Sequence, residues 1–402
     1  MNDGTGPTMG IKYFNFLIFM SAIIFKSVVD AFIIKNDPYG PLNLVKYIIL
    51  VVGILFYLFQ LEIKINQKAK LIFKTEFRTL MIMCGFISLI TVYYILKNGE
   101  FYSRTLQEFA FLLIPIVFSF CALNIFNLHE LIFCAKVALI ILGIGYIFEI
   151  GPINFTPSNI LSTIMNISLA GGNTTSSNSI FESSPFADSL MSLLFFFGYY
   201  KRGNKKWLWT SFFLVLLANK RLMMLFSVAI IVIAYLPNRV AIQNKVLGRW
   251  GWIIGAVMFS ASPFLAEYLV TPQAEWIFLQ KFSINLANFW MGRDSMVVNI
   301  LSSGFVSHGL GSTYVFRGSL LEIEGVKFLL ELGAIGVIVI SFCYWKITKS
   351  HMYSMVMMLY CFLNINTSTS IMTGTFSWIF YLILLGCCTY YGNVYKLNSN
   401  WV

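Results

Sequence analysis

The chain has 402 residues, of which 58% are hydrophobic and only 11% are charged, and its mean hydropathy is +0.77. A soluble domain usually carries about 25% charged residues, because folding in water needs a polar surface. This composition therefore excludes an ordinary soluble protein. The net charge of +11 must then arise from the way in which basic residues are distributed along a membrane-embedded chain.

Apolar stretches long enough for membrane helices recur along the whole sequence. A helix needs roughly 20 mostly apolar residues to cross the hydrocarbon core, and its backbone groups are all paired within the segment. The sequence predicts an all-α polytopic membrane protein with about twelve spans and a single integral membrane domain over residues 1–402. The predicted spans are 11–34, 42–63, 79–96, 106–127, 131–150, 184–200, 207–219, 221–236, 250–269, 326–345, 352–366 and 375–391.

Short basic clusters set the predicted orientation. If the N-terminus is cytoplasmic and the chain alternates, the clusters at 64–78, 201–206 and 239–249 all fall on the inner side. That distribution follows the positive-inside rule and places both termini in the cytoplasm. Most of the basic residues then mark the cytoplasmic side of the membrane, and they also favour contact with anionic lipids. Nucleic acid is not an expected partner, because the basic residues are scattered over separate loops.

Two long hydrophilic segments fall on the opposite, periplasmic side. Residues 151–183 are rich in Ser, Thr, Asn and Gly and contain no Lys or Arg, and residues 270–325 mix charges with aromatic residues. Loops of this length are commonly functional or disordered. The second segment has enough apolar residues to form short amphipathic helices on the membrane surface.

Charged residues inside predicted spans are the first candidates for function, since the bilayer tolerates them poorly. Lys26 and Asp30 lie four residues apart and so share a helix face, as a structural ion pair or as part of a substrate path. Lys220 and Arg221 interrupt the apolar run 207–236 near its middle. A charged break there indicates a polar cavity, and a guanidinium can bind a phosphate through two parallel hydrogen bonds.

The segment 292–311 carries a second set of candidates. Arg293 follows Gly292, although Asp294 could simply neutralise it. His308 begins the sequence His-Gly-Leu-Gly, which predicts a tight turn because glycine reaches positive φ at little cost. The histidine is either a solvated loop residue or an acid–base group that works near neutral pH.

Three acidic residues complete the candidates. Glu322 and Glu324 lie just before the span at 326; they are solvated interfacial charges, a general base with a raised pKa, or ligands for a divalent cation. Glu182 precedes a predicted helix, where it either caps the helix or faces a cavity. The chain has no P-loop, GxSxG or HExxH motif and no cluster of His and Cys, so the sequence predicts neither a cofactor nor a resident metal.

Several of these segments resemble bacterial O-antigen polymerases of the Wzy type, within the O-antigen polymerase/ligase superfamily. The similar elements are the Asn-Lys-Arg break at 219–221, GRDSMVVNIL at 292–301 followed by HGLG, and the Glu-x-Gly-x-x-Gly element in VKFLLELGAIGVIVISF at 326–342. FESSPFADSLMSLL resembles the family's Glu-Pro-Ser element, with the proline displaced to position 185. The resemblance covers mainly residues 180–345 and the overall topology.

The resemblance implies a glycosyltransferase of the bacterial inner membrane that joins oligosaccharide units carried on undecaprenyl diphosphate. It implies that Arg221 and Arg293 hold the diphosphate, with Lys220 and Arg317 in support, and that no metal is required. The base for the attacking hydroxyl is expected among Glu322, Glu324 and His308, in that order. Expected partners are the lipid-linked oligosaccharide, membrane lipids and a chain-length regulator.

Two other functions remain open from the sequence. An O-antigen ligase has the same layout, but ligases usually carry a His-Asn pair where this chain has acidic residues at 322–324. A flippase for the same lipid-linked units also has about twelve spans. It is expected to have two similar halves and cations spread through the bilayer, whereas this chain gathers charge near its long loops and shows no internal repeat.

The predicted orientation can be tested with reporter fusions. Alkaline phosphatase fused at Asn173 and at Gln273 should be active, because the basic clusters at 64–78 and 201–206 hold the other side in the cytoplasm. Green fluorescent protein at the same positions should stay dark. Fluorescence without phosphatase activity at either position would contradict the topology.

Overall fold

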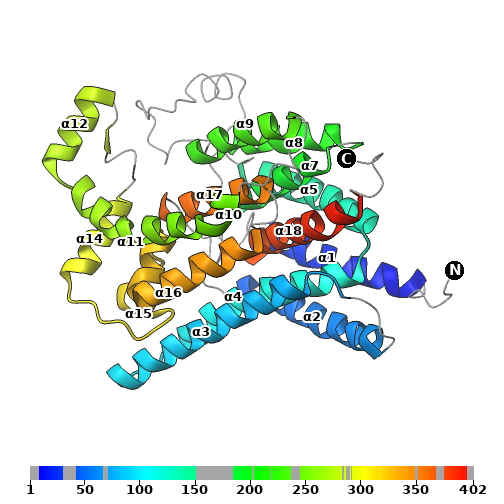
Figure 1. Ribbon diagram of the computed structural model, residues 1–402, viewed down its shortest axis with the longest axis horizontal. Coiled ribbons are helices and arrows are strands. Elements are labelled where there is room, and N and C mark those ends of the chain that lie inside the picture. Colours follow the sequence, from blue (N-terminus) through cyan, green and yellow to red (C-terminus); the bar gives the residue numbers. More distant parts are fainter. Residues whose placement is uncertain are drawn as a thin grey trace.

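The computed structural model describes residues 9–29, 42–66, 71–150, 184–201, 203–218, 220–236, 245–282, 285–286, 290, 292–348, 352–367 and 375–395. Regular structure within these ranges is helical throughout, without strands, as the sequence predicts. Figure 1 shows the longer helices running side by side as a bundle, with α12, α14 and α15 gathered at one end. Asp30, Glu182 and the whole segment 151–183 lie outside the described residues.

The helices follow the predicted order. The first nine are α1 (Met9–Val28), α2 (Leu42–Asn66), α3 (Lys74–Asn98), α4 (Ser103–Ile125), α5 (Leu128–Ile150), α7 (Ser184–Tyr199), α8 (Lys205–Leu217), α9 (Arg221–Tyr235) and α10 (Lys245–Trp250). They are followed by α11 (Trp252–Leu269), α12 (Pro272–Phe282), α14 (Arg293–Ser302), α15 (Ser312–Arg317), α16 (Glu324–Thr348), α17 (Met352–Thr367) and α18 (Thr375–Tyr395).

Seven of the described helices are long and apolar enough to cross a membrane: Gly10–Val28, Val45–Ile65, Lys74–Asn98, Ser103–Ile125, Leu128–Phe148, Trp252–Leu269 and Glu324–Thr348. Shorter apolar helices occupy Phe186–Tyr199, Leu222–Tyr235 and Thr375–Thr389. The protein is therefore an all-α, membrane-embedded chain. Each of the twelve predicted spans falls on a helix, but a count of twelve crossings remains a prediction.

The surface of the bundle is apolar where lipid is expected. Leu89 and Leu96 on α3 are 67% and 79% exposed, and Ile335 on α16 is 70% exposed. Exposed apolar side chains of this size are unfavourable in water and favourable against hydrocarbon. They mark the outward faces of helices whose other faces are packed.

The centre of the bundle consists of helices that are buried almost all round. Every described side chain of α7 from Phe186 to Tyr199 is buried, as is α18 from Thr375 to Cys388. These two helices pack against each other; α4 packs against α18, and α8 packs against α7. A helix that is apolar on all faces is expected to be buried among other helices in this way.

The helix α16 connects this centre to the short helices at the end of the bundle. It packs along α3 and α11 and is broken at Gly333, whose φ of 68° lies in the left-handed region. A Cβ atom at Gly333 would lie 2.9 Å from the Tyr94 hydroxyl, so only glycine fits without strain. Just before the break, the carbonyl of Glu331 accepts a hydrogen bond of 2.7 Å from the Ser307 hydroxyl, which fixes the segment 303–311 against α16.

Candidate functional site

Arg293 and Glu322 form an ion pair at the end of the bundle where α14, α15 and the first turn of α16 lie, which we call the loop end. The Arg293 Nε atom donates to Glu322 Oε2 at 2.6 Å, with 16% of the arginine side chain and 39% of the glutamate side chain exposed. Arg293 is the first residue of α14, directly after Gly292 with its φ of 76°. The structure thus brings together two predicted site residues that are 29 positions apart in the sequence.

A small apolar cluster holds this pair in place. Val297 and Ile300 on α14 pack with Leu321 and Ile323, which flank Glu322, and with Ala266 on α11. Because α14 is anchored through these side chains, its first residue is held at the loop end. The Nε atom of Arg293 is then engaged by Glu322, which leaves a planar guanidinium group of a kind that a lysine does not have.

Glu322 and Glu324 have different surroundings, although they are separated by only one residue. Glu324 begins α16 and is buried, and it interacts electrostatically with Lys327 one turn further along the helix. Glu322 is partly exposed and bound to Arg293. The two carboxylates therefore form separate contacts with two different cations.

A buried network of four charges lies beneath these residues, and the sequence analysis missed it. Glu108 on α4 accepts hydrogen bonds from Arg104 Nε at 2.9 Å and from Lys327 Nζ at 2.7 Å. Lys327 also interacts electrostatically with Glu331, one turn further along α16. All four residues lie in or beside the predicted spans 106–127 and 326–345. Charge inside those spans, at a spacing of four residues within each helix, was the signal that could have identified them.

Glu331 binds the His-Gly-Leu-Gly turn. Its carboxylate accepts hydrogen bonds from the backbone N–H groups of Gly311 at 2.9 Å and Thr313 at 3.1 Å, and from the Thr313 hydroxyl. Gly309 and Gly311 have φ values of 87° and 89°, as the predicted turn requires. A Cβ atom at Gly309 would meet Thr91, so the turn packs directly on α3.

His308 lies beside the connection between α3 and α4. Its Nδ1 atom is 3.0 Å from the Val306 carbonyl oxygen and its Nε2 atom is 3.8 Å from Glu100 Oε2, while its ring packs edge-on against Tyr102. The Tyr102 hydroxyl donates to the same Glu100 carboxylate, which raises the pKa of Tyr102 above its ordinary value. His308 thus belongs to a polar group with Glu100 and Tyr102.

The remaining predicted cations are Arg317, Lys220 and Arg221. Arg317 is the last residue of α15, and its Nη1 atom donates to the Leu320 carbonyl in the adjoining loop. Lys220 directly precedes α9, and its Nζ atom is shielded from solvent without a hydrogen-bond partner among the described residues. Arg221 begins α9, but its side chain lies outside the described part of the structure.

Asp188 on α7 is a buried carboxylate that the sequence analysis did not select. It interacts electrostatically with Lys220 and Lys26, and Asn364 Nδ2 on α17 lies 3.4 Å from its Oδ1 atom. Lys26 also covers the ring of Phe186, with its Nζ atom 4.9 Å from the ring centroid. Lys26 thus interacts with a residue far along the chain, whereas its predicted partner Asp30 lies outside the described residues.

The end of α17 links Asp188 to the loop end. Asn364 faces Asp188, and Asn366 hydrogen-bonds Ser262 on α11 and contacts the backbone of Gly325, directly after Glu324. Asp188 and the start of α16 therefore both lie next to the last residues of α17.

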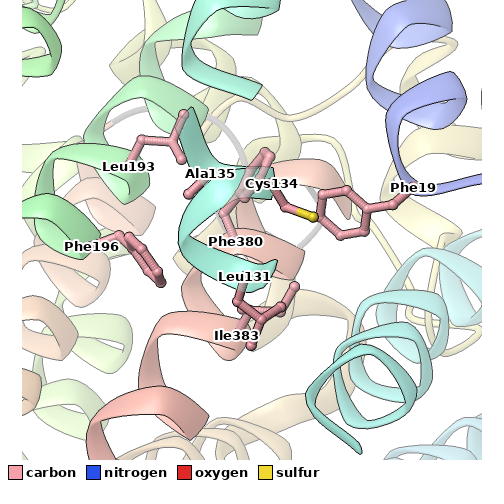
Figure 2. A pocket seen from close by; sticks show the side chains of 8 residues that line it. All are labelled: Phe19, Leu131, Cys134, Ala135, Leu193, Phe196, Phe380 and Ile383. Carbon is pink, nitrogen blue, oxygen red and sulfur yellow. The ribbon is translucent and has the colours of Figure 1, made fainter. Parts of the chain in front are cut away.

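A small cavity lies elsewhere, in the apolar middle of the bundle. It has a volume of about 10 Å³, and Figure 2 shows the side chains around it. It is lined by Phe19, Leu131, Cys134, Ala135, Leu193, Phe196, Phe380 and Ile383. A space of this size and lining holds neither a sugar nor a phosphate, so the cavity is a packing defect and not the site.

Comparison with known proteins finds no match: no family model, no curated protein and no solved structure is detectably similar to this chain.

The buried network generates a stability prediction. Lys327→Met leaves Glu331 without its nearby cation and takes one donor from Glu108, so unfolding should become easier by about 3–5 kcal/mol, as is typical for one broken partner of a buried pair. Combining it with Glu331→Gln removes one charge of each sign and should restore part of that loss. Thermal unfolding in detergent measures both effects.

The matched control for this cycle is Lys346→Met, an exposed lysine on the same helix, which should change stability little. Equal losses for Lys327→Met and Lys346→Met would contradict the network. Strictly additive losses in the double variant would show that Lys327 and Glu331 do not interact.

Proposed function

We propose that the protein polymerises oligosaccharide units linked to undecaprenyl diphosphate, by glycosyl transfer at the periplasmic face of the bacterial inner membrane. The observation that carries the proposal is the Arg293–Glu322 pair, a partly exposed guanidinium and carboxylate held together at the loop end. The pair provides, in one place, the two groups that transfer from a lipid diphosphate needs. The resemblance of its flanking segments to Wzy-type polymerases supports the same reaction.

The chemistry explains why a fixed arginine is required. In the reaction, the bond between the sugar's anomeric carbon and the diphosphate oxygen breaks, and the diphosphate keeps the electron pair. Negative charge therefore grows on the phosphate oxygens, where a preorganised guanidinium stabilises it. Arg293 fulfils this role, with Lys220, Arg221 and Arg317 as further cations on the same diphosphate.

Glu322 is the best-placed base for the attacking sugar hydroxyl. While it is bound to Arg293, its Oε2 atom accepts the hydrogen bond from Nε and is engaged by the guanidinium. A diphosphate that binds the guanidinium competes with Glu322 for it, and so makes the carboxylate available to accept the hydroxyl proton. Substrate binding and base activation are thereby coupled through one ion pair. Glu324, which is buried, and His308, which packs on Tyr102, are the alternative bases.

The first test is whether Arg293 acts through its geometry as well as its charge. Arg293→Lys should lose most polymerising activity, at least about tenfold, while the protein still accumulates in the membrane, because the two-point contact with phosphate is lost. Chain length of the surface polysaccharide on a gel gives the measurement. Arg78→Lys, an exposed arginine at the opposite end of α3, is the matched control. Near-normal chains with lysine at position 293 would rule out the clamp.

A deletion separates polymerase from ligase and flippase. Loss of polymerisation alone should leave surface lipopolysaccharide that carries a single repeat unit, seen as one band above the bare core. Bare core together with long lipid-linked glycan would instead identify a ligase. Bare core with unpolymerised units on the inner leaflet would identify a flippase. If the host makes a capsule, unpolymerised units on the outer leaflet of the carrier lipid are the corresponding result.

A further inference from the structure

The helix α12 has two apolar faces, one packed and one exposed. On the packed face, Ala274 is fully buried and Phe278 lies against the same small apolar cluster. On the other side, Pro272, Trp276 and Leu279 lie four and three residues apart, so they form one stripe along the helix, which we call the outer stripe. Trp276 is 63% exposed and Leu279 is 50% exposed.

The outer stripe is the reverse of what an aqueous surrounding selects. A helix that packs one face on a protein and turns the other to water carries polar residues on the outward face. The polar residues of α12 lie beside the stripe instead, with Glu275 on one flank and Gln273 and Gln280 on the other, all of them exposed. A surrounding that is apolar in front of the stripe and polar along its flanks is the layer between lipid head groups and acyl chains.

The lipid-facing surface of α11 leads directly to α12. Near the end of α11, Phe264 is 71% exposed and Tyr268 is 45% exposed, and Val270 after it is 44% exposed. The helix α11 is long and apolar enough to cross a membrane, and only Val270 and Thr271 separate it from α12. The helix α12 therefore starts where a candidate span ends, and Tyr268 and Trp276 are aromatic residues of the kind that concentrates at membrane interfaces.

The junction between α11 and α12 redirects the chain. The Thr271 hydroxyl donates to the Tyr268 carbonyl at 2.6 Å and accepts a hydrogen bond from the Ala274 N–H group at 3.3 Å, so it closes one helix and caps the next. Pro272, the first residue of α12, has no N–H group with which to continue the hydrogen bonds of α11. Figure 1 shows α12 at the edge of the loop end, directed across the long helices and not along them. A helix that lies in the plane of a membrane crossed by α11 has this direction.

We propose that α12 is an interfacial anchor whose outer stripe is seated between the head groups and the acyl chains of the leaflet at the loop end. The partner is a lipid surface, which the stripe recognises through its apolar area. Charge has little part in the contact, because α12 carries one acidic and one basic residue, Glu275 and Lys281. The polar flanks of the helix remain among the head groups. This anchor does not rest on the proposed polymerase reaction.

The anchor also sets the depth of the segment that leads to Arg293. Ala274 of α12 forms a cluster with Leu269 of α11 and Leu286, and Trp290 packs against the same cluster. Trp290 lies three residues before Arg293, the first residue of α14. Through these contacts, a helix fixed at the level of the head groups holds the start of α14 close to the level of the lipid phosphates.

The test places a photo-crosslinking residue on either side of α12 in the full-length protein in lipid nanodiscs. Trp276→benzoylphenylalanine should form adducts with lipid acyl chains, measured by mass spectrometry. Its yield should be severalfold higher than that of Lys281→benzoylphenylalanine, the matched control, because Lys281 is exposed on the same helix but faces away from the stripe. The yield at position 276 should be alike in phosphatidylcholine and phosphatidylglycerol nanodiscs, because the stripe is uncharged.

Three results of this experiment would overturn the anchor. Equal lipid adducts at the two positions would show that α12 has no fixed orientation on the membrane. Adducts that form only in phosphatidylglycerol would show a contact made through charge. A covalent dimer, or a crosslink from position 276 to another protein in intact cells, would show that protein and not lipid covers the stripe.

A second set of variants tests the anchor without a crosslinker. Trp276→Ser combined with Leu279→Ser removes the outer stripe and leaves the packed face of α12 unchanged. In nanodiscs, trypsin should then cut after Lys281 severalfold faster than in the wild-type protein, because α12 is no longer held on the membrane. Gln273→Ser combined with Gln280→Ser, on the polar flank of the same helix, should keep the wild-type rate. A cleavage rate that does not respond to loss of the stripe would contradict the anchor.

Discussion

A bundle solvated by lipid cannot leave an ionised side chain without compensation, and this constraint determines how the loop end is assembled. Glu108 is 2% exposed and is stabilised by two cations, one from its own helix and one from α16. Lys327 in turn faces Glu331, which binds the backbone of the turn at 309–313. Glu108 thus holds Lys327, Lys327 interacts with Glu331, and Glu331 attaches the loop segment to the bundle. The short helix α15, which contains Thr313, is therefore attached to α16 and packs against α4.

The same constraint separates charges that support the structure from charges that are available for chemistry. Arg104 and Lys327 both bind the buried Glu108 through short contacts, and Lys327 also interacts electrostatically with Glu331 and Glu324. The Arg293–Glu322 pair, by contrast, is partly exposed. A buried carboxylate that is bound by two cations has little left to offer a ligand, whereas a partly exposed ion pair can exchange one partner for it. This difference supports Arg293 as the proposed contact for the substrate.

Much of the fold follows from the sequence, because helix position depends on local composition. The predicted spans at 79–96, 106–127 and 326–345 fall on α3, α4 and α16, and the two glycines at 309 and 311 adopt the turn that their spacing predicts. The partners of charged residues were much harder to predict. Arg293, which Asp294 could have neutralised, pairs with Glu322; Lys26 interacts with Asp188, while its predicted partner Asp30 lies outside the described residues. Those pairings depend on which helices are neighbours, which no local pattern specifies. Glu108, Lys327 and Glu331 could have been identified without knowing which helices are neighbours, because each is a charged residue inside a predicted apolar span.

The hydrogen bond between Glu108 and Lys327 joins residues 219 positions apart, and this separation has a consequence for how the protein is made. Ribosomes add roughly 5–20 residues per second, so α4 is synthesised roughly 10–40 seconds before Lys327 exists. During that interval Glu108 enters the membrane without its later partner. Arg104, one helical turn away on α4, already binds the same carboxylate with its Nε and Nη2 atoms. The helix α4 therefore supplies a counter-ion for Glu108 during biogenesis. It can remain in the bilayer without net charge until α16 is inserted.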